Sequence, residues 1–152
     1  MAQDLATTLA YASRKPLIGT AAYYLLKLLG VELPRAVPLG EGLVITHGGF
    51  GIVIHSQAVI GNRVKIYPGV TIGRADIYQP ASNSRFRSVN IEDDVILSPG
   101  CKVLCKEGVL TVGQGTVVGA NAVLLQSTGE WEIWAGIPAR RVGQRHPIET
   151  TS

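Results

Sequence analysis

Aliphatic residues recur every six positions through most of this chain, and that period restricts the fold more than any other feature of the sequence. It matches neither the period of an α-helix nor the two-residue alternation of a long β-strand. It is typical of a prism of short strands, in which each hexad forms one face, three faces complete a coil, and aliphatic side chains stack inside as ladders. The positions that keep this phase are Leu33, Leu39, Ile45, Ile54, Ile60, Ile66, Ile72, Ile91, Leu97, Val103, Val112, Val118 and Leu124.

A second inward position accompanies the first. Four residues after many of the aliphatic positions stands a small or β-branched residue, namely Val37, Ala58, Val64, Val70, Val95, Cys101, Thr116 or Ala122. The chain has 18 glycines, which suit tight corners between short strands. A β-sandwich of short strands is the competing interpretation, but a sandwich does not require one phase to persist over so many hexads. The sequence therefore predicts an all-β protein, a single-stranded parallel β-helix of hexapeptide repeats.

Three insertions interrupt the repeat. Nine residues instead of six separate Ile45 from Ile54, a long insertion occupies about residues 75–88, and a three-residue insertion falls near residues 106–108. Insertions in a solenoid emerge as loops on its surface, where binding sites usually form. We therefore expect functional residues in or beside these segments.

The repeat is expected to have different structure at its two ends. We predict a short N-terminal helical segment (1–31), a β-helix domain (32–143) whose last residues form a C-terminal cap, and a polar tail (144–152). Residues 16–29 are predicted to form a helix with an apolar stripe of Ile18, Ala22, Leu25 and Leu29, and a shorter helix is expected before it. The apolar stretch is too short to span a membrane, so at most a peripheral membrane contact of this helix is predicted.

Composition excludes several classes of protein. Hydrophobic residues make up 46% of the 152 residues and charged residues 16%, which excludes a highly charged disordered chain. The net charge of +3 comes without a run of Lys or Arg, so no nucleic-acid partner is expected. Cys101 and Cys105 would be about 13 Å apart in a strand, too far for a disulfide, and no second Cys/His pair completes a zinc site. We expect reduced thiols, no metal and a cytoplasmic protein.

The repeat and the segment from Ala135 to Arg140 resemble the hexapeptide-repeat acyltransferases, over about residues 30–143. The segments Gly30–Pro34, Leu43–Gly48 and Gly69–Gly73 resemble serine acetyltransferases and, equally, the acetyltransferases of capsule, colanic-acid and O-antigen biosynthesis. The resemblance implies a left-handed β-helix, acetyl-CoA as co-substrate, and a homotrimer with the active site between neighbouring prisms. It also implies direct acetyl transfer to a hydroxyl group.

His47 is the predicted general base. The resemblance places the catalytic histidine at this position, and an alcohol needs a base of near-neutral pKa before it can attack a thioester. Glu32 stands fifteen positions earlier, where serine acetyltransferases carry an aspartate, so it is the predicted partner of the imidazole. Thr46 replaces a second aspartate of many serine acetyltransferases. The alternative readings are a solvated surface histidine and a solvated glutamate after a helix.

The acceptor site is predicted in the long insertion. Serine acetyltransferases place an Arg-His-Pro segment just before the returning hexad, and here Arg87 is retained while Ser88 replaces the histidine. This difference speaks against serine as the acceptor. Tyr78, Arg85 and Arg87 would suit a saccharide, because they offer an aromatic surface and guanidinium donors. We therefore expect a saccharide or another small hydroxyl-bearing acceptor, and a role in polysaccharide biosynthesis; an ordinary polar loop is the alternative.

Coenzyme A is expected on the later coils. The resemblance places the pantetheine arm along an edge of the prism, against small residues that allow close approach, and the phosphates near two arginines. The predicted residues are Gly119, Ala120, Ala135, Gly136, Arg140 and Arg141.

Three other functions compete with this one. The first is a true serine O-acetyltransferase of cysteine biosynthesis, and the second is a non-catalytic hexapeptide scaffold. The third is a γ-class carbonic anhydrase, which needs three zinc-binding histidines, whereas only His47 and His55 lie in the repeat. The last is therefore the weakest.

Overall fold

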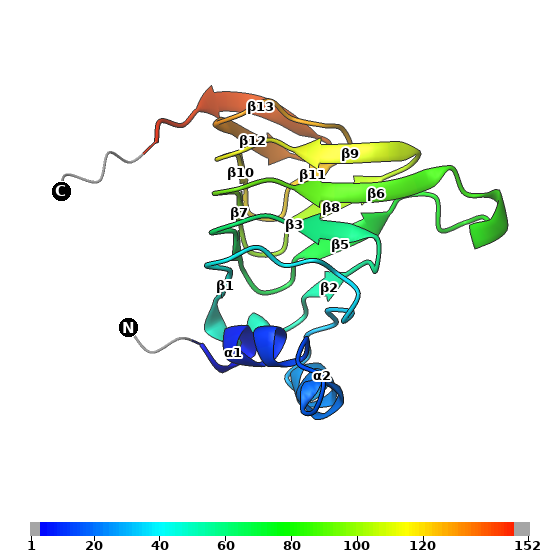
Figure 1. The fold of residues 1–152 in the computed structure, drawn as a ribbon. Coiled ribbons are helices and arrows are strands. Elements are labelled where there is room, and N and C mark those ends of the chain that lie inside the picture. Colours follow the sequence, from blue (N-terminus) through cyan, green and yellow to red (C-terminus); the bar gives the residue numbers. More distant parts are fainter. Residues whose placement is uncertain (1–3, 148–152) are drawn as a thin grey trace.

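The computed structural model describes residues 4–147 as a parallel β-helix with two helices at one end and a hairpin at the other (Figure 1). Three parallel sheets form its sides. The first face contains β1 (Val44–Ile45), β4 (Lys65–Ile66), β7 (Ile96–Leu97), β10 (Val117–Val118) and β12 (Glu132–Gly136). The second face contains β2 (Val53–Ile54), β5 (Thr71–Arg74), β8 (Lys102–Cys105) and β11 (Val123–Leu124). The third face contains β3 (Ala58–Ile60), β6 (Phe86–Ile91) and β9 (Gly108–Val112).

Ladders of aliphatic side chains fill the interior. On the first face, the strand register stacks Ile45 on Ile66, Ile66 on Leu97 and Leu97 on Val118. The other two faces repeat this arrangement, through Ile54, Ile72, Val103 and Leu124 and through Ile60, Ile91 and Val112. Every predicted aliphatic position is buried except Leu39, which is half-buried, and every residue of the second inward set is buried. The hexad prediction is therefore confirmed.

Two helices precede the repeat, α1 (Leu5–Ala12) and α2 (Gly19–Leu28). Helix α2 falls within the range predicted for a helix, but the predicted apolar stripe is only half right: Ala22 is buried and Leu29 packs against the core, as predicted, while the other two residues are exposed. Ile18 and Leu25 are 52% and 51% exposed, whereas Leu26 is fully buried. Apolar residues surround most of α2, so the sequence period alone could not select the face that packs against α1 and the prism. Within residues 4–147, no helix has the length and apolar content needed to cross a membrane.

Helix α1 covers the open edge of the first coil. In the first coil of a β-helix, the N–H and C=O groups that face away from the second coil have no neighbouring strand. Such groups are costly when they are buried without partners. Side chains of α1, and Arg14 just after it, supply those partners. Thr7 bonds both backbone groups of Ile45 at 2.8 and 3.3 Å, Tyr11 bonds Leu43 N and Gly40 O at 2.9 and 2.6 Å, and Arg14 donates to Pro34 O and Val37 O at 3.2 and 3.1 Å.

The hairpin of β12 and β13 (Ala139–Gln144) covers the other end of the prism. Strand β12 extends the first face in parallel, with Trp134 stacked on Val118, and β13 then returns antiparallel to it. This is the terminal cap expected from the sequence. Residues 1–3 of the predicted helical segment and 148–152 of the predicted tail lie outside the described residues. Cys101 points into the core, as predicted, and burial raises its pKa to about 12, which makes the thiol unreactive.

Candidate active site

His47 lies in a tight turn at the end of β1, η1 (His47–Gly49). The three extra residues between Ile45 and Ile54 form this turn, so the imidazole leaves the prism wall and is exposed. The backbone of His47 has a φ of 51°, in the left-handed region that non-glycine residues rarely adopt. Its ring centroid lies 6.3 Å from that of Tyr67, at the corresponding corner of the next coil. The side chain is therefore available to a ligand, as its predicted role requires.

The turn belongs to one edge of the prism, where the first face meets the second; we call this the His47 edge. Corner residues of successive coils stack along it. Gly69 N donates to Phe50 O, Gly100 N to Pro68 O and Asn121 N to Pro99 O, each at 2.9 Å. The edge thus runs from the turn after β1 to the turn after β10 and ends beside β12.

The residues predicted to bind coenzyme A lie at the far end of the same edge. Gly119 and Ala120 follow β10, and Ala135 and Gly136 end β12. Gly119 N donates to Trp134 O at 2.7 Å, and a Cβ added at Gly119 would lie 3.3 Å from that of Ala135. A side chain at Gly119 would therefore crowd the next coil, so this position favours glycine independently of any ligand. Strand β1 and strand β12 are four strand spacings apart on the first face, or about 19 Å.

The two predicted phosphate-binding arginines differ in their surroundings. Strand β13 pairs Arg140 with Ala135 and Arg141 with Trp134. Arg141 Nε lies 3.1 Å from Glu132 Oε1, so its charge is partly neutralised. Arg140 is exposed, and within residues 4–147 its guanidinium donates to one backbone carbonyl, that of Ala139, at 3.1 Å. Arg140 is therefore the freer of the two cations for an anionic ligand.

Glu32 does not pair with His47. Its carboxylate accepts a hydrogen bond from the Tyr23 hydroxyl at 2.8 Å and forms an ion pair with Lys27 Nζ at 2.9 Å, and both partners belong to α2. Hydrogen bonds from Lys27 and Tyr23 lower the pKa of Glu32 against the opposing effect of its partial burial. The predicted contact between His47 and Glu32 is therefore wrong. Glu32 lies on the second face beside Val53, and its carboxylate is bonded to residues of α2 instead.

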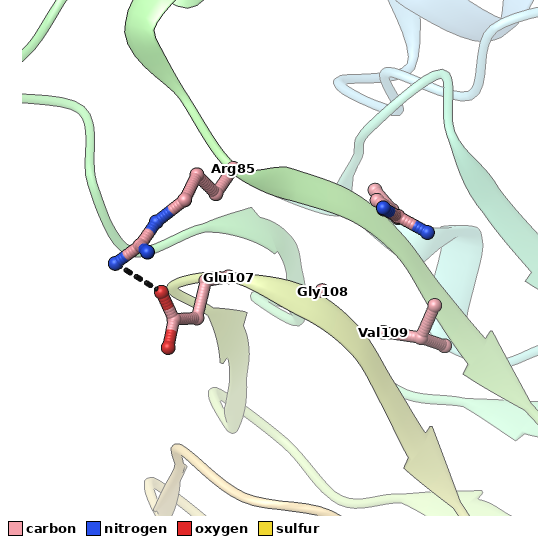
Figure 2. A pocket seen from close by; sticks show the side chains of 5 residues that line it. Arg85, Glu107, Gly108 and Val109 are labelled. Carbon is pink, nitrogen blue, oxygen red and sulfur yellow. Dashed lines mark ion pairs between the residues drawn. The ribbon is translucent and has the colours of Figure 1, made fainter.

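The predicted acceptor residues divide between two places. Arg85 and Arg87 line an open hollow of about 570 Å³ together with Glu107, Gly108 and Val109. Figure 2 shows the Arg85 guanidinium directed at the Glu107 carboxylate, with which it forms an ion pair. Tyr78 is 75% exposed and is not among the residues of this hollow. The hydroxyl of Ser88, the residue that replaces the expected histidine, donates a hydrogen bond to Asn90 Oδ1 at 3.3 Å.

A second hollow of about 510 Å³ lies on the second face, beside the long loop. Its lining is mostly apolar and includes Val53, Ile77, Leu104 and Leu125, together with His55. His55 is half-buried, with its ring edge-on to Phe86 at 4.9 Å between centroids. Burial and the charge of Arg74 lower the pKa of His55, so the imidazole is neutral at physiological pH.

The loop and His47 stand at opposite edges of the second face. Strand β5 begins just after Gly69 on the His47 edge and ends at Arg74, where the loop begins. The residues predicted to bind the acceptor therefore lie across the width of that face from His47 of the same chain. A site that used both would need the loop of a second copy.

Sequence reasoning missed one neighbour of His47. The Asp4 carboxylate accepts a hydrogen bond from Gly48 N at 2.9 Å and caps α1 through Ala6 N at 2.9 Å. An aspartate just before an apolar helical run is a recognisable N-cap signal, but its second contact is more than forty residues away in sequence. Among residues 4–147, no three His, Cys, Asp or Glu side chains gather in a way that could hold a metal ion.

Comparison with known proteins shows which proteins this chain resembles. No protein-family model matches the chain. It is 37% identical over 115 residues to a serine acetyltransferase of Bacillus licheniformis, covering 76% of this chain and 49% of that protein. It is 34% identical over 131 residues to one of Synechococcus elongatus, covering 86% and 50%. The chain is a hexapeptide-repeat relative of serine acetyltransferases.

Solved structures agree with this relationship. A serine acetyltransferase in complex with CoA matches with a TM-score of 0.70 and 29% identity, over 90% of this chain and 55% of that one. The Neisseria gonorrhoeae enzyme in complex with serine matches with a TM-score of 0.72 and 26% identity, over 91% and 55%. These matches confirm the predicted left-handed β-helix of hexapeptide repeats. The chain spans about half the length of the curated relatives it matches.

Proposed function

We propose that this chain is an acetyl-CoA-dependent O-acetyltransferase and that His47 is its general base. The observation that carries the proposal is the shared edge: an exposed imidazole at one end and the predicted coenzyme A residues at the other. The separation of about 19 Å suits an extended pantetheine arm whose sulfur ends near His47. Similarity to serine acetyltransferases supports the same reaction.

The proposed reaction is a direct transfer. The imidazole of His47 takes the proton of the acceptor hydroxyl as the oxygen attacks the thioester carbonyl. The tetrahedral intermediate collapses with cleavage of the carbon–sulfur bond, and the imidazolium returns the proton to the departing thiolate. Products are the acetyl ester and free coenzyme A. A backbone N–H on the His47 edge would stabilise the intermediate's oxyanion.

Serine is the acceptor that the relatives favour over the saccharide expected from the loop. The matched proteins are named serine acetyltransferases, and one was solved with serine. The loop residues lie across the second face from His47 of the same chain, which supports a trimer in which a neighbouring copy brings its loop to this edge. Ser88 is the specific residue that keeps a saccharide as the second candidate, because the histidine expected there is absent.

The experiment is a thiol-release assay with acetyl-CoA and a panel of serine, free sugars and sugar nucleotides. We expect release with serine and a His47→Ala loss of about 10²–10⁴-fold in turnover. His146→Ala is the matched control, since His146 is exposed and lies after β13, and it should retain full activity. If thiol is released with a sugar and not with serine, the proposed acceptor is wrong, but the proposed acetyl transfer stands. An active His47→Ala variant, or no release with any acceptor, would contradict the proposal and favour a scaffold.

A further inference from the structure

The carboxylate of Asp4 joins helix α1 to the turn that carries His47. Its Oδ1 accepts from Ala6 N at 2.9 Å and caps the helix, while its Oδ2 accepts from Gly48 N, also at 2.9 Å. Gly48 directly follows His47 in the chain. The two oxygens of one side chain therefore serve two separate elements.

Thr7, in the first turn of α1, holds the chain on the N-terminal side of His47. Thr7 accepts from Ile45 N at 2.8 Å and donates to Ile45 O at 3.3 Å. Residue 45 and residue 48 are thus both bonded to the first turn of α1, with His47 between them. The turn needs such support, because the backbone of His47 is in the left-handed region, which residues other than glycine rarely adopt.

Capping alone does not explain an aspartate at this position. Ser and Asn cap helices about as well as Asp, through one oxygen. A carboxylate offers two acceptor oxygens, and here one caps the helix while the other accepts from Gly48 N. The second contact is therefore the feature specific to Asp4.

We propose that Asp4 is a positioning residue, which fixes the direction of the His47 imidazole by anchoring the Gly48 amide to the N-terminus of α1. This inference rests on the proposed function, in which His47 is the general base. A misplacement of about 1 Å in such a group lowers turnover strongly, about 10²-fold in well-studied cases. Asp4 would then set the rate of the chemical step without touching either substrate.

The decisive variant is Asp4→Ser, whose hydroxyl caps α1 but is too short to reach Gly48; Asp4→Asn, which keeps one acceptor oxygen, is the second. Thr8→Ala is the matched control, because the exposed Thr8 hydroxyl donates to the Asp4 carbonyl of the same helix turn and, among the described residues, to no other group. Hydrogen exchange of the Gly48 amide and the NMR signals of the His47 ring are measured with no substrate. Turnover and KM for acetyl-CoA are measured separately.

In Asp4→Ser we expect faster exchange at Gly48, altered His47 ring signals, and a kcat about tenfold lower with a nearly unchanged KM. Thr8→Ala should match the wild type in all four. An unchanged kcat in Asp4→Ser, or unchanged Gly48 exchange, would overturn the positioning role. If the wild type itself releases no thiol, the proposed function fails, and Gly48 exchange still decides whether Asp4 anchors the turn.

Discussion

At the scale of single residues, one carboxylate organises the long loop beside the second face. Arg74 Nε lies 2.8 Å from Asp76 Oδ1, and the Asp76 side chain is fully buried. Gln79 Nε2 donates to Asp76 Oδ2 at 2.7 Å. Hydrogen bonds from Ser84 and from Arg74 hold the pKa of Asp76 well below its usual range. Arg74 stands where the loop begins and Gln79 lies within it, so this one carboxylate connects two parts of the loop.

This arrangement predicts an acid-sensitive loop. The folded-state pKa of Asp76 is lower than its unfolded value of about 3.9, so its stabilising contribution is complete at neutral pH. It declines as the pH falls below about 4, where the unfolded chain begins to bind the proton first. Asp76→Asn should melt at a lower temperature than the wild type at pH 7, and the difference should shrink by pH 3. A constant difference across that range in thermal melts would contradict the prediction.

The residues of the candidate site were only partly predictable from sequence. His47 could be found because it falls on a break in a strict period and in a recognised motif. The partner of Glu32 could not, since Tyr23 and Lys27 come within reach only when α2 packs beside the first coil. The contact between Asp4 and Gly48 is equally a result of tertiary packing. Local pattern therefore located the candidate base, and tertiary packing decided what surrounds it.

At the scale of elements, α1 replaces a missing strand with side-chain hydrogen bonds. The Tyr11 hydroxyl accepts from Leu43 N at 2.9 Å and donates to Gly40 O at 2.6 Å, so one group connects two backbone groups of the first coil. Both are parts of an edge that no strand covers. Helix α1 thus supplies hydrogen-bond partners that the backbone of the first coil would otherwise lack.

Tyr11→Phe tests this edge role. The change keeps the ring and leaves two backbone groups without their partner, so we expect a loss of about 1–3 kcal/mol in the free energy of unfolding, measured by urea denaturation. Tyr24→Phe is the matched control, because the Tyr24 side chain is 59% exposed, and its effect should stay within about 0.5 kcal/mol. Equal losses in the two variants would show that the edge does not depend on the Tyr11 hydroxyl.

The elements themselves were predictable to different degrees. The strands follow from the hexad phase, because an inward residue at one position per face leaves little freedom for register. The buried side of α2 did not follow, because Leu25 and Leu26 are equally apolar and only the packing surface distinguishes them. The course of the long loop also depends on a buried ion pair that no periodicity signals.

At the scale of the whole molecule, stability is distributed along stacked ladders. Each coil contacts mainly the coils before and after it, as in other solenoids. Ile66 stands in the second coil of the first face, between Ile45 and Leu97, and is 1% exposed. A cavity at this position therefore weakens the contact with both neighbouring coils, including the one that carries His47.

Ile66→Ala should accordingly cost about 2–5 kcal/mol in the free energy of unfolding. Lys65→Ala is the matched control on the same strand, because Lys65 points outward and should change stability by less than about 0.5 kcal/mol. Ile45 packs directly on Ile66, and His47 follows Ile45 by two residues. Hydrogen exchange at Ile45 should therefore rise more in Ile66→Ala than exchange at Val123, on the second face near the opposite end. A uniform rise at both sites would mean that the prism unfolds as one unit, and that the support of the His47 turn cannot be separated from the stability of the whole.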